Sequence, residues 1–105
     1  MKSRHEIEVD FQRAMTQASR LREISNEMSR LAKNDFEGNL QSIASNWKGQ
    51  NATAYLNKGK ILENRISNTA GNIGAVATVI ENTARRIREA EIRAYEEAKK
   101  REYSS

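Results

Sequence analysis

Apolar residues recur along the first half of the chain at steps that are mostly three or four residues, the spacing of one helical face. They are Ile7, Phe11, Ala14, Ala18, Leu21, Ile24, Met28, Leu31, Phe36, Leu40, Ile43 and Trp47. Asn34, Asp35 and Gly38 weaken this pattern without ending it. The spacing therefore predicts one amphipathic helix from about residue 6 to about residue 45.

The second half of the chain is more regular. Its apolar or small positions alternate steps of four and three, the 3.5-residue period of a coiled-coil seam. They are Leu62, Ile66, Thr69, Ile73, Val76, Ile80, Thr83, Ile87, Ala90 and Ala94. Gly71 and Gly74 each cost about 1 kcal/mol inside a helix, and we interpret them as a close-packing site or a mild bend. The pattern predicts a second helix over about 52–100.

Residues 46–51 have the composition of a turn between these helices. Gly49 can adopt a left-handed backbone conformation, and Asn51 can cap the helix that follows. The chain has no proline to interrupt either arm. The predicted fold is therefore all-α, a single domain over 1–105 that forms an antiparallel helix-turn-helix hairpin.

The composition argues against an enzyme and against a bound metal or cofactor. The chain has no cysteine, so it offers neither a disulfide framework nor a Cys/His metal site. Its one histidine, His5, lies near a terminus, and carboxylates such as Glu6 and Asp10 fall on exposed helix positions. A two-helix hairpin also provides no sizeable concave site. We expect no catalytic residues, no metal and no cofactor.

The middle of the second arm predicts a partner. Residues 66–80 carry no charge on any face, and in a hairpin they lie opposite roughly residues 17–31, which cover only one side. We interpret the uncovered side as a dimer interface that joins two hairpins into a four-helix bundle. It is formed by Ile66, Ile73, Val76 and Ile80. The alternative is that Ser67, Asn68, Asn72 and Thr78 simply face water.

The net charge of +4 raises the alternative of a nucleic-acid-binding hairpin. Between residues 85 and 102, however, seven cations are interleaved with five acids, and no aromatic platform for single strands accompanies them. A solvated helix face is the favoured interpretation, so we expect no nucleic-acid partner. The narrow, alanine-rich seam and mixed charges likewise argue against a helix that disrupts membranes.

The N-terminal residues MKSRHEIEVD lack the apolar stretch of a cleavable signal peptide, and no window approaches about 20 apolar residues. If the protein is secreted, we expect it to pass from the cytoplasm without such a signal. A membrane would then be met only through the secretion apparatus.

The single tryptophan stands two residues before a glycine, at Trp47-Lys48-Gly49, between the two predicted helices. With this motif, the chain resembles the WXG-motif (ESAT-like) family, relatives of the early secreted antigenic target of mycobacteria that are common in Gram-positive bacteria. The resemblance covers the whole length. It implies a non-enzymatic hairpin that pairs with itself or with a related small WXG-like protein and is exported through the membrane ATPase of a type VII secretion system.

The family often carries a C-terminal export signal, a tyrosine followed four residues later by an acid. Here Tyr95 is followed at that distance by Lys99, so Tyr95 with Glu96 or Glu97 is at best a degenerate signal. This departure supports an alternative function, a companion that binds the helical N-terminal domain of a larger exported toxin.

Trp47 itself has two compatible interpretations. It can close the end of the bundle as a core aromatic beside the turn that Gly49 permits, or it can form a surface recognised by a partner or an export machine. Replacing a fully buried Trp47 by alanine would cost about 3–5 kcal/mol.

Overall fold

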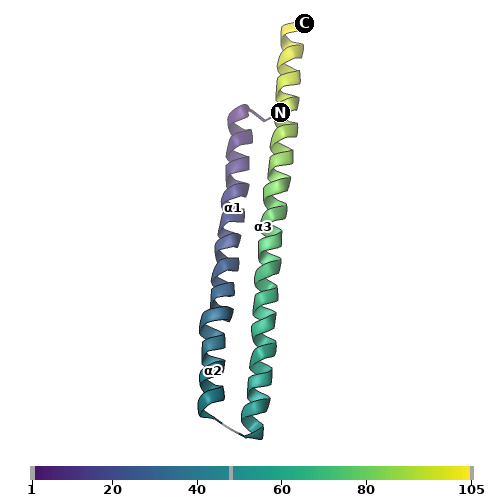
Figure 1. Ribbon diagram of the computed structural model, residues 1–105. Helices are drawn as coiled ribbons and strands as arrows, with labels where there is room; N and C mark the ends of the chain where they lie inside the picture. Colours follow the sequence, from purple (N-terminus) through teal and green to yellow (C-terminus); the bar gives the residue numbers. More distant parts are fainter. Residues whose placement is uncertain (1, 48, 105) are drawn as a thin grey trace. The chain divides into compact units, whose positions relative to one another are not determined.

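The computed structural model describes residues 2–47 and 49–104. Helix α1 spans Arg4–Arg30, a π-helical segment η1 spans Leu31–Phe36, α2 spans Glu37–Asn46 and α3 spans Gln50–Ser104 (Figure 1). These described residues contain no β-strand. The all-α prediction is confirmed, and both predicted helices extend a few residues beyond their expected bounds.

The chain divides into two compact units. The turn unit is Leu21–Ala75, and it contains the end of α1, η1, α2 and the first half of α3. The terminal unit combines Met1–Arg20 with Val76–Ser105, so it pairs the start of α1 with the second half of α3.

In the turn unit the two arms run antiparallel. Ser25 donates a hydrogen bond from Oγ to the carbonyl oxygen of Ala70 at 2.7 Å, and Leu40 lies against Gly59. As the first arm is followed from Ser25 to Leu40, the contacted residue on α3 moves back from Ala70 to Gly59, which is the order that two antiparallel helices produce. The predicted position of residues 17–31 opposite 66–80 is therefore confirmed for the part of those ranges within this unit.

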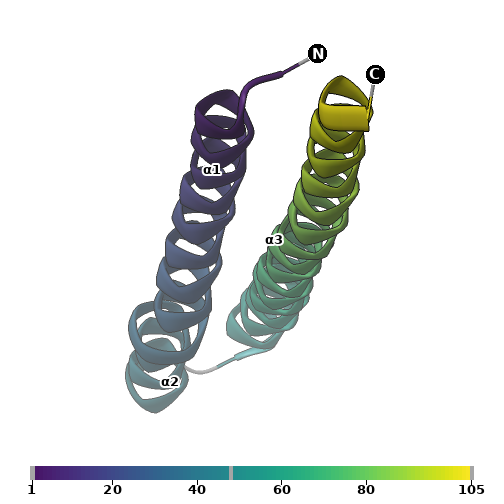
Figure 2. The ribbon, with the colours of Figure 1, turned by 90° about the horizontal axis from the view of Figure 1, so that it is seen from above.

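The terminal unit has the same antiparallel order. Arg88 binds Glu8, and Lys2 binds Glu91. Here α1 and α3 lie side by side in both views (Figure 1 and Figure 2).

Helix α1 begins with a capping box. Ser3 Oγ accepts a hydrogen bond from the backbone N–H of Glu6 at 3.1 Å, and the Ser3 N–H donates to Glu6 Oε1 at 3.5 Å. This Ser-x-x-Glu arrangement satisfies backbone N–H groups that the first turn leaves unpaired. The cap moves the start of the helix to Arg4, ahead of the predicted start at about residue 6.

The core between the arms consists mainly of alanine. Six of the eight buried apolar residues are alanines, and no large side chain among the described residues is fully buried. In the terminal unit the buried positions are Ile7, Ala18, Ala77 and Ala84, and in the turn unit they are Ala32, Leu40, Ala52 and Ala70. Methyl groups allow the two backbones to approach closely but remove little apolar area from water.

The predicted seam of α3 is only partly correct. Burial is greatest at Ala70, Ala77 and Ala84, one position beyond the predicted Thr69, Val76 and Thr83. One residue corresponds to a rotation of about 100° around the helix. The packed face is therefore turned toward the small residues, because only these fit between closely spaced backbones. Several larger seam residues are left about half exposed: Leu62 at 48 %, Val76 at 51 % and Ile87 at 50 %.

The first arm contains a π-helical segment that the sequence analysis did not predict. The Glu37 N–H bonds to the carbonyl oxygen of Ala32, five residues earlier, and also to that of Asn34. Ala32 and Leu40 are both buried although they are eight residues apart, a spacing that puts them about 80° apart on a regular α-helix. A π turn absorbs one extra residue and restores both side chains to one face.

The glycines of α3 differ in their surroundings, and this difference predicts opposite effects of alanine. Gly71 has open space where a side chain would go, whereas a Cβ at Gly59 would lie 2.5 Å from Leu40 Cδ2. Gly71→Ala is expected to raise the free energy of unfolding by about 1 kcal/mol. Gly59→Ala should bring no such gain, because the packed Leu40 must move. Urea denaturation of the two variants at one protein concentration measures this difference, and equal gains would contradict the packing.

Candidate functional site

The motif residues Trp47 and Gly49 form the connection between α2 and α3 in the turn unit. Trp47 ends α2 in an extended conformation (φ −124°, ψ 120°), and its N–H still bonds to the Ile43 carbonyl oxygen at 2.8 Å. Gly49 has a φ of +121°, a region that residues with a side chain rarely adopt. The expected conformational role of Gly49 is therefore confirmed. Lys48, which the predicted 46–51 turn includes, lies outside the described residues.

The start of α3 corrects one expectation. The Gly49 carbonyl oxygen accepts hydrogen bonds from the Thr53 N–H at 3.1 Å and the Thr53 hydroxyl at 3.3 Å. The helix consequently begins at Gln50, and Asn51 lies inside its first turn rather than at the capping position. The prediction that Asn51 caps this helix is wrong, because the positive φ of Gly49 reverses the chain earlier.

Trp47 is not enclosed within the chain. Trp47 is 47 % exposed and Tyr55 is 54 % exposed. The centres of their two rings lie 5.8 Å apart. Replacing Trp47 by alanine was expected to cost about 3–5 kcal/mol only if the ring were fully buried. Trp47 is not fully buried, so this cost does not apply. The pair instead presents two aromatic rings at the surface, where a partner could bury them.

Beside this pair, the turn unit contains an open groove of about 610 Å³ between α2 and α3. One side is formed by Phe36, the last residue of η1, and by Asn39, Leu40, Ser42 and Ile43 of α2. The α3 side is formed by Tyr55, Lys58, Gly59 and Leu62. This groove corrects the expectation from the sequence that a two-helix hairpin provides no sizeable concave site. The available signals were the five-residue step from Leu31 to Phe36 and the glycine at position 59.

The residues expected at the dimer interface have intermediate or high exposure. Val76 is 51 % exposed, whereas Ile66, Ile73 and Ile80 have intermediate exposure. Val76 thus offers the most accessible apolar surface of the four.

The residues considered in the sequence as a degenerate export signal, Tyr95, Glu96 and Glu97, lie on α3 in the terminal unit. Tyr95 is partly buried, and Glu96 and Glu97 are exposed. The Lys99 ammonium lies 5.3 Å from the centre of the Tyr95 ring. Its pKa is raised, first by a hydrogen bond with the Tyr95 side chain. The position where the family carries an acid is therefore occupied by a cation in contact with the tyrosine.

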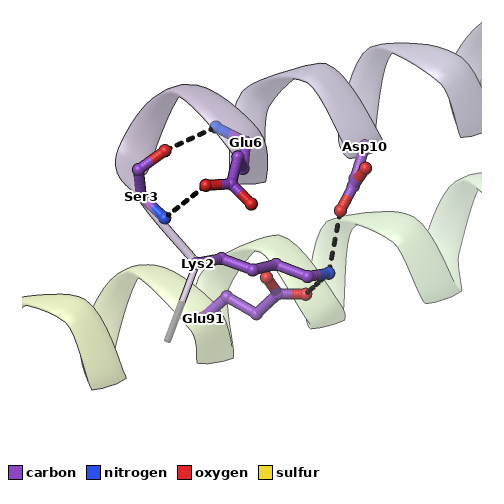
Figure 3. Close-up of polar contacts among 5 residues, drawn as sticks. All are labelled: Lys2, Ser3, Glu6, Asp10 and Glu91. Carbon is purple, nitrogen blue, oxygen red and sulfur yellow. Dashed lines mark hydrogen bonds and ion pairs between the residues drawn. The ribbon is translucent and has the colours of Figure 1, made fainter.

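Ion pairs join the two arms of the terminal unit, and Figure 3 shows the cluster around Lys2. The Lys2 ammonium lies 2.8 Å from Asp10 Oδ2 on α1 and 3.3 Å from Glu91 Oε1 on α3. Nearby, Arg88 donates from Nε and Nη2 to Glu8 Oε1 at 2.9 and 2.6 Å, and its guanidinium lies 5.2 Å from the centre of the Phe11 ring. These contacts fix the N-terminal residues against α3.

The pairing of Lys2 changes two pKa values in a direction that stabilises the folded chain at neutral pH. The hydrogen bond to Asp10, and then that to Glu91, raises the pKa of Lys2, and Lys2 in turn lowers the pKa of Asp10. The contribution of Asp10 is lost as the pH falls through its lowered pKa, and that of Lys2 as the pH rises through its raised pKa.

Lys2→Met is expected to return the pKa of Asp10 toward its ordinary value, because the ammonium that favours the carboxylate is gone. An NMR titration of the Asp10 carboxyl carbon measures this shift. Lys33→Met, which changes the net charge equally at a site distant in sequence, serves as the control. An unchanged Asp10 pKa in Lys2→Met would contradict the contact.

In the basic segment Arg88 is paired with Glu8, while Arg85 and Arg86 bond to Asn82 and Thr83. No cluster of three or more metal-ligating side chains occurs among residues 2–47 and 49–104. Over the same residues, no helix combines the length and apolar content that crossing a bilayer requires.

Comparisons with protein-family models, with curated proteins and with solved structures gave no match to the chain.

Proposed function

We propose that this chain is a small non-enzymatic protein of the WXG-motif type, exported by a type VII-like secretion system or acting there as a targeting partner. The observation that carries the proposal is the position of Trp47 and Gly49 at the reversal between two helices, with Trp47 47 % exposed. An aromatic ring that is exposed beside a chain reversal is suited to recognition by another protein.

The exposed area supports a working state with a partner. The chain exposes 8005 Å², about 2000 Å² more than is usual for a globular monomer of its mass. A stable interface buries about 800 Å² on each partner. We therefore propose a homodimer, or a heterodimer with a related small WXG-like protein, whose contact includes Ile66, Ile73, Val76 and Ile80. Two hairpins joined in this way would make a four-helix bundle.

Secretion from a Gram-positive host with a type VII-like system tests the proposal. We expect the tagged chain in the culture medium of the parent strain and not in that of a mutant lacking the membrane ATPase. A cytoplasmic marker protein controls for cell lysis. Equal amounts in both media would contradict export by this route.

The contact between Lys99 and Tyr95 favours a second candidate function, a companion of a larger exported toxin. In that case the partner supplies the export signal that this chain lacks. Lys99→Glu separates the two functions, because it creates the family spacing of tyrosine and acid. If the chain is exported by its own signal, the variant should leave the cell several-fold more efficiently. If the chain is a companion, secretion should instead depend on co-expression of the toxin.

A further inference from the structure

The groove of the turn unit is bounded by two ridges of matching length. On the first arm, Phe36 at the end of η1 and Asn39, Leu40 and Ile43 of α2 stand at positions i, i+3, i+4 and i+7, and Ser42 lines the groove between the last two. On α3 the lining residues Tyr55, Lys58, Gly59 and Leu62 repeat the same spacing. Each ridge is therefore two helical turns long, about 11 Å. A helix of a third segment can lie along such a pair of ridges and place its own i, i+3/i+4 and i+7 residues between them.

Two local features of the sequence build this groove. Leu40 is 6 % exposed and lies against Gly59, where the missing side chain leaves room for it, so this contact forms the floor. The extra residue absorbed by η1 turns Leu40 toward α3, and Phe36 and Ile43 consequently line the groove beside it rather than the seam. Single π turns within α-helices occur frequently at functional sites.

The walls of the groove remain uncovered within the chain. Tyr55 is 54 % exposed and Leu62 is 48 % exposed. At the end nearest the turn, Tyr55 contacts the ring of Trp47. Exposed apolar groups that border a groove with a few polar groups are typical of a protein-binding surface.

Lys58 gives the groove a charge preference. It is the one ionisable cation among the described lining residues, and no carboxylate lines the groove beside it. No hydrogen bond or ion pair from residues 2–47 and 49–104 reaches its ammonium. An apolar occupant with a carboxylate at this position would complement the groove in both shape and charge.

We propose that this groove binds an amphipathic helix of a partner protein, with apolar residues at i, i+3 or i+4 and i+7 and an aspartate or glutamate that reaches Lys58. This inference rests on the proposed function as a partner-binding protein and specifies where and by what chemistry the partner is recognised. The mid-length surface at Val76 stays available to a second copy of the chain.

A defined peptide tests the proposal without knowledge of the natural partner. The probe is a labelled helical peptide of about 18 residues, long enough to form an isolated helix, with leucines at the stated spacing and one central glutamate. A matched peptide carries lysine in place of that glutamate. Fluorescence anisotropy with the full chain should show the glutamate peptide binding about five-fold more tightly, the size expected of an exposed ion pair.

Charge reversal at the groove should reverse this preference. Lys58→Glu is expected to bind the lysine peptide more tightly, whereas Lys60→Glu, which changes the same charge outside this groove, should keep the original order. Circular dichroism confirms that both variants remain helical. Absence of saturable binding up to about 1 mM, or an unchanged preference in Lys58→Glu, would overturn the proposal.

Occupation by a second copy is the competing outcome, and it is separately recognisable. If the wild-type dimer dissociates on Leu62→Ser and does not bind the glutamate peptide, the groove is an interface between copies and the partner-helix proposal is wrong. The export assay is independent of these measurements. ATPase-dependent secretion combined with failure of the peptide would therefore refute the groove while leaving the proposed function in place.

Discussion

Ala70→Glu is expected to unfold the chain at room temperature. Ala70 is fully buried between the arms of the turn unit, and its carbonyl oxygen accepts the 2.7 Å hydrogen bond from Ser25. A glutamate there either buries a carboxylate without a partner or forces the helices apart, which costs at least about 3 kcal/mol. A core built mainly of alanines has little stability from which to lose that amount. Far-ultraviolet circular dichroism should show most of the helix signal lost.

Ala75→Glu provides a matched control, because it introduces the same charge five residues further along the same helix at an exposed position. Its helix content should remain close to that of the wild type. If both variants stay folded, or if both unfold, Ala70 is not the close contact between the arms that the structure indicates.

Gly49→Val is expected to lower the free energy of unfolding by about 2 kcal/mol, because a β-branched residue is strained at positive φ. The φ of +121° at Gly49 reverses the chain between α2 and α3. Either the connection keeps this conformation under strain or the first turn of α3 unwinds. The midpoint of urea denaturation measures the loss.

Gly38→Val is the control for this substitution. Gly38 lies within α2, has open space around it and has no positive φ. Valine there should change the free energy of unfolding by no more than about 0.5 kcal/mol. Equal losses at the two glycines would mean that the conformation of Gly49 has no special importance.

The elements of the fold could be predicted because their signals are local. Steps of three and four residues define both helices, and Gly49 in a polar stretch defines the corner. The start of α1 could have been placed better, since Ser3 and Glu6 form a recognisable capping box. Gly71 and Gly74 do not interrupt α3, because packing of the surrounding seam outweighs the low helix propensity of two residues.

The packed face was harder to predict because size mattered more than hydrophobicity. The most apolar stripe of α3 includes Leu62, Val76 and Ile87, but the arms meet at Ala70, Ala77 and Ala84. A periodicity analysis that ranks residues by hydrophobicity selects the larger side chains. The close approach of two backbones selects the smaller ones instead.

The candidate site was predicted only in part. Trp47 and Gly49 could be placed at the turn from sequence, but the exposure of the indole depends on the register of the two arms. That register also places Leu40 on Gly59, and it depends on one π turn. The five-residue step from Leu31 to Phe36 marked that turn, but a single irregular step is a weak signal beside many regular ones.

The half-exposed apolar surface around Val76 leads us to expect that a second copy of the chain covers it. Multi-angle light scattering over a range of protein concentrations tests it most directly, with Val76→Glu, a charge placed on a half-exposed apolar position, measured alongside. We expect the wild type to have twice the 11.9 kDa mass of one chain and Val76→Glu to have the mass of one chain. A wild type that stays a folded monomer at the highest concentration, or a variant that keeps the wild-type dimer, would contradict it.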